Sequence, residues 1–141
     1  MTRIMAIDYG DKRVGIALSD PMHIISYPLC TINNYSKEIL IDNILEILNE
    51  KDVNKIIIGL PLSMSGKYSN QTKKVICFKD LLIKELAIKN LNIIINTLDE
   101  RLSSVSAKNI MIQQGIKTGH NKSKIDELSA AIILQEYLDS K

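Results

Sequence analysis

The fold of this chain is decided by one stretch, Arg3–Gly15, which reads RIMAIDYGDKRVG. Its apolar run Ile4–Ile7 is too short for a typical helix and leads into Asp8 and then a glycine, so we interpret it as a buried strand. Beyond the glycine, apolar and small residues alternate from Val14 to Ser19. That alternation predicts a second strand, and the two strands together predict a hairpin that turns at residues 10–12.

Asp8 continues one apolar face of the first strand. The period of two places Asp8 with Ile4 and Ala6, while Tyr9 falls on the opposite face. A carboxylate on a buried face is costly unless it is paired or bound to a cation, so Asp8 is the first candidate functional residue. Aspartate is also common at strand ends and turns, and a purely structural role for Asp8 stays open at this point.

Length and composition indicate one soluble domain, residues 1–141, with its own core. The hydrophobic share of 45% and the charged share of 24% are ordinary for a globular protein. No apolar run approaches the roughly 20 residues of a membrane span, and no signal peptide is recognisable. We therefore expect a cytoplasmic protein without a membrane partner. The net charge of +2 is too small to indicate nucleic-acid binding by itself.

The cysteines and histidines give no metal-binding pattern. Cys30 and Cys77 lie far apart without a Cys-x-x-Cys motif, so we expect reduced, buried thiols. His23 and His120 also lack the spacing of metal ligands.

Periodicity and chain breakers predict the remaining elements. They are a strand over 27–32, a helix over 37–51 capped by Ser36, a strand over 55–59, a loop over 60–68, a helix over 69–90 with an inner stripe of Val75, Phe78, Leu82 and Leu86, a strand over 92–98, a helix over 102–114 and a last helix from about Ser123. The β-branched run at 55–59 is typical of a strand covered on both faces, and 92–98 is a second continuous run. Pro28 suits an edge strand or the start of a strand.

The order of these elements predicts a mixed α/β sheet, in which an antiparallel meander of three strands is extended by two parallel strands. The loop over 60–68 is longer than a minimal strand-to-helix connection. It is either a functional loop or a tolerated surface insertion.

Three acids are placed where this topology can bring them together. Asp8 ends the first strand, Asp99 or Glu100 ends the last, and Asp126 lies in the first turn of the final helix. Ligands of open α/β sheets bind at the carboxyl ends of the strands, and alternation allows only one of Asp99 and Glu100 to face a shared site. Clustered carboxylates repel unless cations hold them, and oxygen ligands favour Mg²⁺ or Mn²⁺ over zinc. Two such ions can position a water and stabilise the leaving oxygen of a phosphodiester.

Four sequence blocks occur in order along the chain. They are DYGxxRVG at 8–15, GLPxxMxG at 59–66, DERLS at 99–103 and DxxSAA at 126–131. Together they resemble the YqgF/RuvX family over essentially the whole chain. The resemblance implies an RNase H-like, three-layer fold and a metal-dependent nuclease of the bacterial cytoplasm. That family is described both as a nuclease maturing the 5′ end of pre-16S ribosomal RNA and as a Holliday junction resolvase.

The resemblance also assigns site residues. It identifies Asp8, Glu100 and Asp126 as the catalytic and metal-binding acids, which would hold Mg²⁺ or Mn²⁺, two ions when substrate is bound. Basic residues near these acids in the sequence are candidates for phosphate contacts, with a solvated surface role equally open: Lys12, Arg13, Arg101, Lys122 and Lys124.

The expected partner is a structured nucleic acid, pre-ribosomal RNA in preference to junction DNA, bound by a monomer or homodimer. Cleavage of branched DNA is the nearest alternative. A non-catalytic RNA-binding assembly factor is a more remote one. A nucleotide-binding unit of the sugar-kinase and actin kind would need two such domains around a cleft, and 141 residues supply one.

Overall fold

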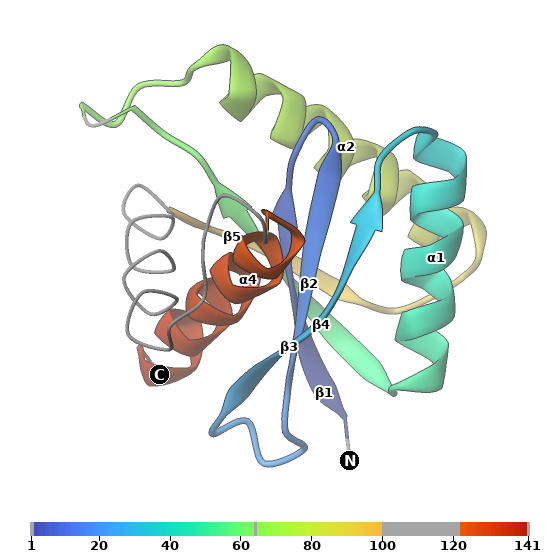
Figure 1. Ribbon diagram of the computed structural model, residues 1–141. Coiled ribbons are helices and arrows are strands. Elements are labelled where there is room, and N and C mark those ends of the chain that lie inside the picture. The colour runs from blue at the N-terminus through green and yellow to red at the C-terminus, as the bar shows by residue number, and fades with distance from the viewer. Residues whose placement is uncertain (1, 64, 100–121, 141) are drawn as a thin grey trace.

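The computed structural model describes residues 2–63, 65–99 and 122–140 (Figure 1). In chain order its elements are β1 (Arg3–Tyr9), β2 (Arg13–Ser19), β3 (Ser26–Asn33), α1 (Lys37–Glu50), β4 (Val53–Leu60), α2 (Asn70–Ile88), β5 (Ile94–Asp99) and α4 (Lys122–Asp139). Each was predicted from the sequence, with boundaries that differ by one or two residues. The helix predicted over 102–114 lies outside the described residues.

The five strands form one sheet in the order β3-β2-β1-β4-β5. β1 pairs antiparallel with β2, and β2 antiparallel with β3, whereas β4 runs parallel to both β1 and β5. The predicted mixed five-stranded sheet is therefore confirmed. Pro28 lies on the edge strand β3, beside an irregularity in its pairing with β2. An edge strand tolerates proline because no strand pairs with its outer side, so the missing N–H costs no hydrogen bond there.

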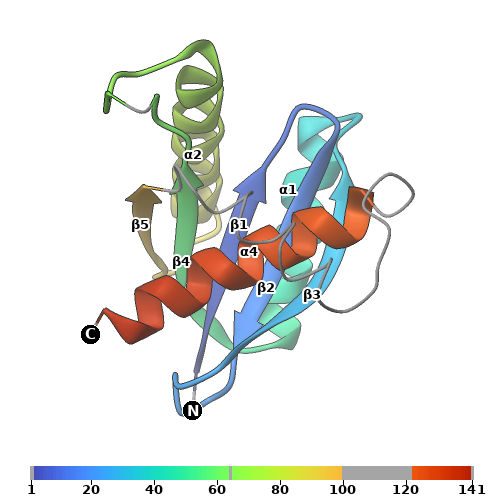
Figure 2. The same cartoon turned by 60° about the vertical axis from the view of Figure 1, so that its left-hand side comes forward.

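Helices cover both faces of the sheet and make three layers (Figure 2). Met5, Ile7 and Tyr9 of β1 belong to a core that contains the buried side chains of α1 and α2. Ile4 and Ala6 belong to a second core, which α4 closes from the other face. The alternation read from the first strand is confirmed, and β1 at the centre of the sheet serves both cores.

Both helices of the first core begin at serine caps, of which the one at Ser36 was predicted. The Ser36 side chain accepts a hydrogen bond from the Ile39 backbone, and Ser69 and Thr72 form a capping box at the start of α2. The Thr72 hydroxyl also donates to the carbonyl of Pro61, which attaches the loop after β4 to α2. The predicted inner stripe of α2 is buried at every position.

The expectation that both cysteine thiols are buried is wrong. Cys77 is exposed and Cys30 only half-buried. Cys77 lies two residues after Val75, and two residues turn a helix by about 200°, so its side chain leaves the inner stripe. The second continuous run forms the edge strand β5, where the side chain of Ile94 is 56% exposed. Within the described ranges, no helix is long and apolar enough to cross a membrane.

Candidate functional site

The carboxyl end of β1 places Asp8 beneath α4. Asp8 pairs in register with Gly15 of β2 and follows Ile4 and Ala6 on the face that α4 covers. Directly opposed residues of an antiparallel pair project to the same side of the sheet. Asp8 is partly buried, in agreement with a carboxylate at the end of a central strand.

Gly15 lets the first turn of α4 lie directly on β2. A Cβ atom at Gly15 would overlap the carbonyl oxygen of Asp126 and crowd the backbone nitrogen of Glu127. Only a hydrogen atom fits between the strand and the helix at this point. Asp8 and Asp126 therefore both adjoin Gly15, one across the strand pair and the other above it. The structure brings these two predicted acids together.

Arg13 connects the hairpin to the same helix. Its Nε donates to Oδ2 of Asp126 at 2.8 Å, and the two side chains are 33% and 24% exposed. Arg13, which was predicted to contact phosphate, thus donates a hydrogen bond to Asp126, which was predicted to be catalytic. The guanidinium offsets the negative charge of Asp126 and fixes its orientation.

The structure describes the remaining predicted site residues in less detail. Glu100 and Arg101 lie outside the described residues, and of Lys122 and Lys124 only the helical backbone of α4 is described. Lys12 is exposed in the turn of the hairpin. Their predicted roles remain predictions.

Asp99 is the last residue of β5. It aligns with Leu60 of β4, whose side chain packs against the α1 and α2 core. The register therefore assigns Asp99 to the face opposite Asp8. Because Asp99 ends an edge strand, its charge still reaches Glu136 of α4, as the pKa of Glu136 shows.

Glu136 should lower the stability of the protein at neutral pH. Burial and then the charge of Asp99 raise the pKa of Glu136 above its ordinary value. A carboxyl group with a raised pKa in the folded state destabilises that state as pH rises above the unfolded-state pKa of about 4.3. Glu136→Gln should therefore raise the free energy of unfolding by about 0.5 kcal/mol or less at pH 7, and leave it unchanged near pH 3. Urea denaturation at both pH values measures this, and equal effects at the two would contradict it.

The described donors suit a hard divalent cation. Asp8 and Asp126 offer carboxylate oxygens only, the ligands that Mg²⁺ and Mn²⁺ prefer. Within 2–63, 65–99 and 122–140, no three His, Cys, Asp or Glu side chains are placed so that they could hold a metal ion together. A third carboxylate would have to come from elsewhere, and the sequence resemblance assigns that place to Glu100.

Gly15 was not recognised from the sequence as a candidate residue. The sequence does contain a signal for its role, because a glycine inside an alternating strand often marks the close approach of another backbone. Gly15 sets the distance between the helix that carries Asp126 and the strand pair that carries Asp8.

Solved structures show which known fold the chain shares. RuvC of Thermus thermophilus, in a structure titled as a complex with a Holliday junction substrate, matches with a TM-score of 0.57. The match covers 99% of this chain and 95% of that one at 12% identity. Such low identity shows the fold alone, and the fold is RNase H-like, as predicted.

Sequence relatives then define the family. The family model described as "RuvX: Holliday junction resolvase" matches residues 2–140. A protein of Chloroflexus aurantiacus is 38% identical over 138 residues, covering 98% of this chain and 87% of its own. One of Bacteroides fragilis is 41% identical over 143 residues, covering 100% and 99%. Both are named "Putative pre-16S rRNA nuclease". The chain belongs to the RuvX family and is a phosphodiester-cleaving hydrolase.

Proposed function

We propose that this chain is a metal-dependent endonuclease that processes the 5′ end of pre-16S ribosomal RNA in the cytoplasm, as a monomer or homodimer. The observation that carries the proposal is the placement of Asp8 and Asp126 around Gly15, at the carboxyl end of β1. The name shared by relatives 38% and 41% identical over nearly the whole chain supports the substrate.

In this proposal Asp8, Asp126 and Glu100 hold Mg²⁺ or Mn²⁺, with two ions in the substrate complex. When bound, such ions supply positive charge at the scissile phosphate and at the leaving oxygen. Asp126 is oriented for this task by Arg13. When a cation neutralises Asp126 instead, the Arg13 guanidinium becomes available for a phosphate, which it can grip with two parallel hydrogen bonds. Lys12, Arg101, Lys122 and Lys124 are proposed to contact further phosphates.

Arg13→Gln should weaken substrate binding more than metal binding. Loss of the partly exposed ion pair should cost about 1 kcal/mol of stability or less. Loss of one phosphate contact should flatten the slope of log affinity against log salt by about 0.7–0.9. Binding of a precursor RNA over a salt series, together with a metal titration of the melting temperature, measures both effects. An unchanged affinity and salt slope with lowered stability would assign Arg13 to the ion pair alone.

Resolution of Holliday junctions is the second candidate. The description of the family model names this activity, and RuvC of Thermus thermophilus has the same fold. Both candidates would use the same carboxylates, so the site does not favour one over the other. We place ribosomal RNA first because of the relatives' names.

Cleavage of both substrates side by side tests the proposal. A precursor of 16S ribosomal RNA and a four-way DNA junction are incubated with the protein in Mg²⁺, in Mn²⁺ and in EDTA. We expect metal-dependent cutting near the 5′ end of the mature RNA and little cutting of the junction. Efficient resolution of the junction without cutting of the RNA would overturn the proposal in favour of the second candidate. Binding of the RNA without cutting would favour an assembly factor.

A further inference from the structure

A second polar surface lies on the opposite side of the strand that carries Asp8. There a pocket of about 460 Å³ opens between the hairpin turn, the start of α1 and the first turns of α2. Its lining includes Tyr9, Asn34, Tyr35, Lys37, Lys73 and Lys74. Tyr9 follows Asp8 directly in β1 and projects to the other face. The pocket and the acids are therefore on the two sides of one strand end.

Hydrogen bonds hold the walls of this pocket in place. The Asn34 side chain donates to the carbonyl of Gly10 at 2.9 Å, and the Asn34 backbone donates to Lys12 at 2.8 Å. Lys74 pairs with Asp11 at 3.1 Å and joins the turn to α2. The ring of Tyr9 stacks on Phe78 with centroids 4.4 Å apart and forms the floor. Both ends of the hairpin turn are thereby attached to neighbouring elements, so the pocket is preformed.

Two of the three lysines at the pocket are available for a ligand. Lys74 shares its charge with Asp11, whereas Lys37 and Lys73 are exposed and have no acidic partner within the described part of the chain. Tyr35 is 87% exposed beside them. Exposed aromatic rings next to basic groups are typical of surfaces that bind single-stranded nucleic acid, where bases stack on the rings and phosphates contact the cations.

We propose that this surface, the Tyr35 pocket, binds a single-stranded segment of the RNA substrate. One base stacks on Tyr35, and the adjoining phosphates contact Lys37 and Lys73. The inference rests on the proposed function and extends it: the bound strand passes over the hairpin turn, from the Tyr35 pocket on one face to Asp8 on the other. The pocket would thus select precursors that carry an unpaired segment next to the cleavage site.

Binding of a fluorescent eight-nucleotide oligouridine in EDTA tests the pocket without any cleavage. Tyr35→Ala should lower the affinity about tenfold, and Tyr35→Phe, which keeps the ring, should restore it. The double variant Lys37→Gln, Lys73→Gln should reduce the slope of log affinity against log salt by about 1.4. The matched control is Lys79→Gln, Lys84→Gln, which removes the same charge from α2 away from the pocket and should leave the slope nearly unchanged.

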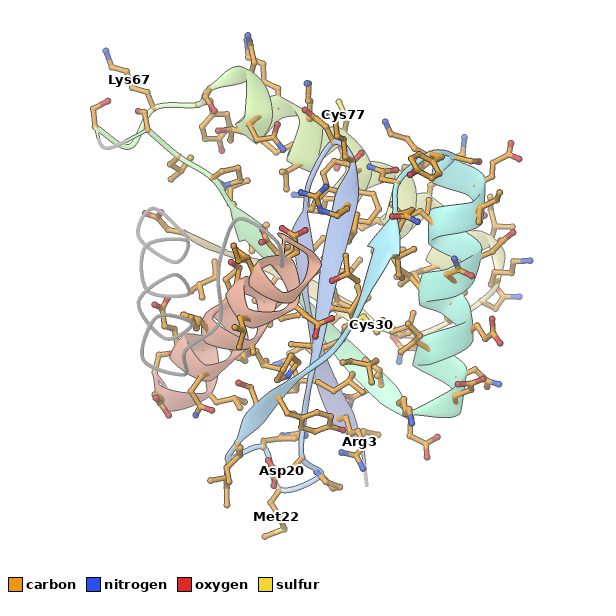
Figure 3. All side chains as sticks on the ribbon, viewed as in Figure 1. Arg3, Asp20, Met22, Cys30, Lys67 and Cys77 are labelled. Atoms are coloured by element: carbon orange, nitrogen blue, oxygen red, sulfur yellow. The ribbon has the colours of Figure 1, made fainter. Side chains whose placement is uncertain are left out.

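Cys77 reports where the oligonucleotide lies. It is exposed at the pocket beside the hairpin (Figure 3), so bound RNA should slow its alkylation by iodoacetamide. Cys30 on β3 is the internal reference. Burial, and next the charge of Glu127, raise the pKa of the Cys30 thiol, and its slow reaction should not change with RNA.

The outcomes separate this inference from the proposed function. Equal losses of binding in the pocket pair and the control pair, or no protection of Cys77, would overturn the Tyr35 pocket. Cleavage of the precursor could persist in that case. Conversely, binding at the pocket by a protein that leaves the precursor uncut would overturn the proposed function and support the pocket alone.

Discussion

Asp8→Asn should lower the rate of metal-dependent cleavage at least about a hundredfold while the chain stays folded. Asparagine keeps the shape of the side chain and removes the charge that would hold a divalent cation. Asp8 lies near the end of a strand whose other side chains supply both cores, and none of those contacts changes. Single-turnover cleavage of the precursor RNA measures the loss.

Melting curves with and without metal identify the cause of that loss. Metal-free Asp8→Asn should be at least as stable as the parent protein near neutral pH, because Asp8 and Asp126 no longer repel each other around Gly15. Mg²⁺ at a hundred times its dissociation constant should stabilise the parent by about 2.7 kcal/mol and the variant much less.

Asp99→Asn is the matched control, since it makes the same chemical change on the other side of the sheet. Its cleavage rate and its response to metal should stay close to those of the parent. Normal cutting by Asp8→Asn, or an equal loss of stability with and without metal, would make Asp8 a structural residue. The nuclease proposal would then lose its chemical basis.

Gly15→Ala should have the second-largest effect. The added methyl group cannot be accommodated by a side-chain rotation, because it meets the backbone of α4 at Asp126 and Glu127. The helix must move away from β2, at a cost of about 1–3 kcal/mol in the free energy of unfolding. Displacement of Asp126 by about 1 Å should lower cleavage about a hundredfold even in the fraction that remains folded. Urea denaturation and cleavage per folded molecule measure the two effects separately.

Ala17→Gly is the control for this experiment. Ala17 lies two residues along β2 and is buried against the same helix. Its change to glycine should cost about 0.5–1 kcal/mol without pushing α4, so cleavage per folded molecule should persist. If Gly15→Ala also cuts normally per folded molecule, the distance between α4 and β2 does not control the site.

Local sequence patterns predicted most of the fold. The inner stripe of α2 and the alternation after the hairpin turn each repeat with the period of their own element, so a short window suffices to recognise them. The position of a strand within the sheet, in contrast, cannot be recognised from a short window. The runs Ile56–Ile58 and Ile93–Ile95 have the same composition, yet β4 is central and β5 is an edge. Which of the two strands is covered on both sides depends on the strand order, and the sequence of a single strand does not specify that order.

The sequence indicated candidate site residues but not the contacts between them. Asp8 and Asp126 were recognised from their places at the ends of elements, and the structure brings both to Gly15. The ion pair of Arg13 with Asp126 joins residues 113 positions apart, and no local sequence pattern predicts it. The Tyr35 pocket likewise combines side chains from three elements, none of which carries a motif.

The separation between Arg13 and Asp126 also determines when a growing chain can complete the proposed site. The strand with Asp8 leaves the ribosome early, whereas α4 follows every strand of the sheet. At about 5–20 residues per second, synthesis of the intervening 113 residues takes roughly 5–25 seconds. During that interval the nascent chain holds Asp8 and Arg13 without Asp126. An enzyme whose proposed substrate is part of the translation machinery would thus emerge from its own ribosome inactive.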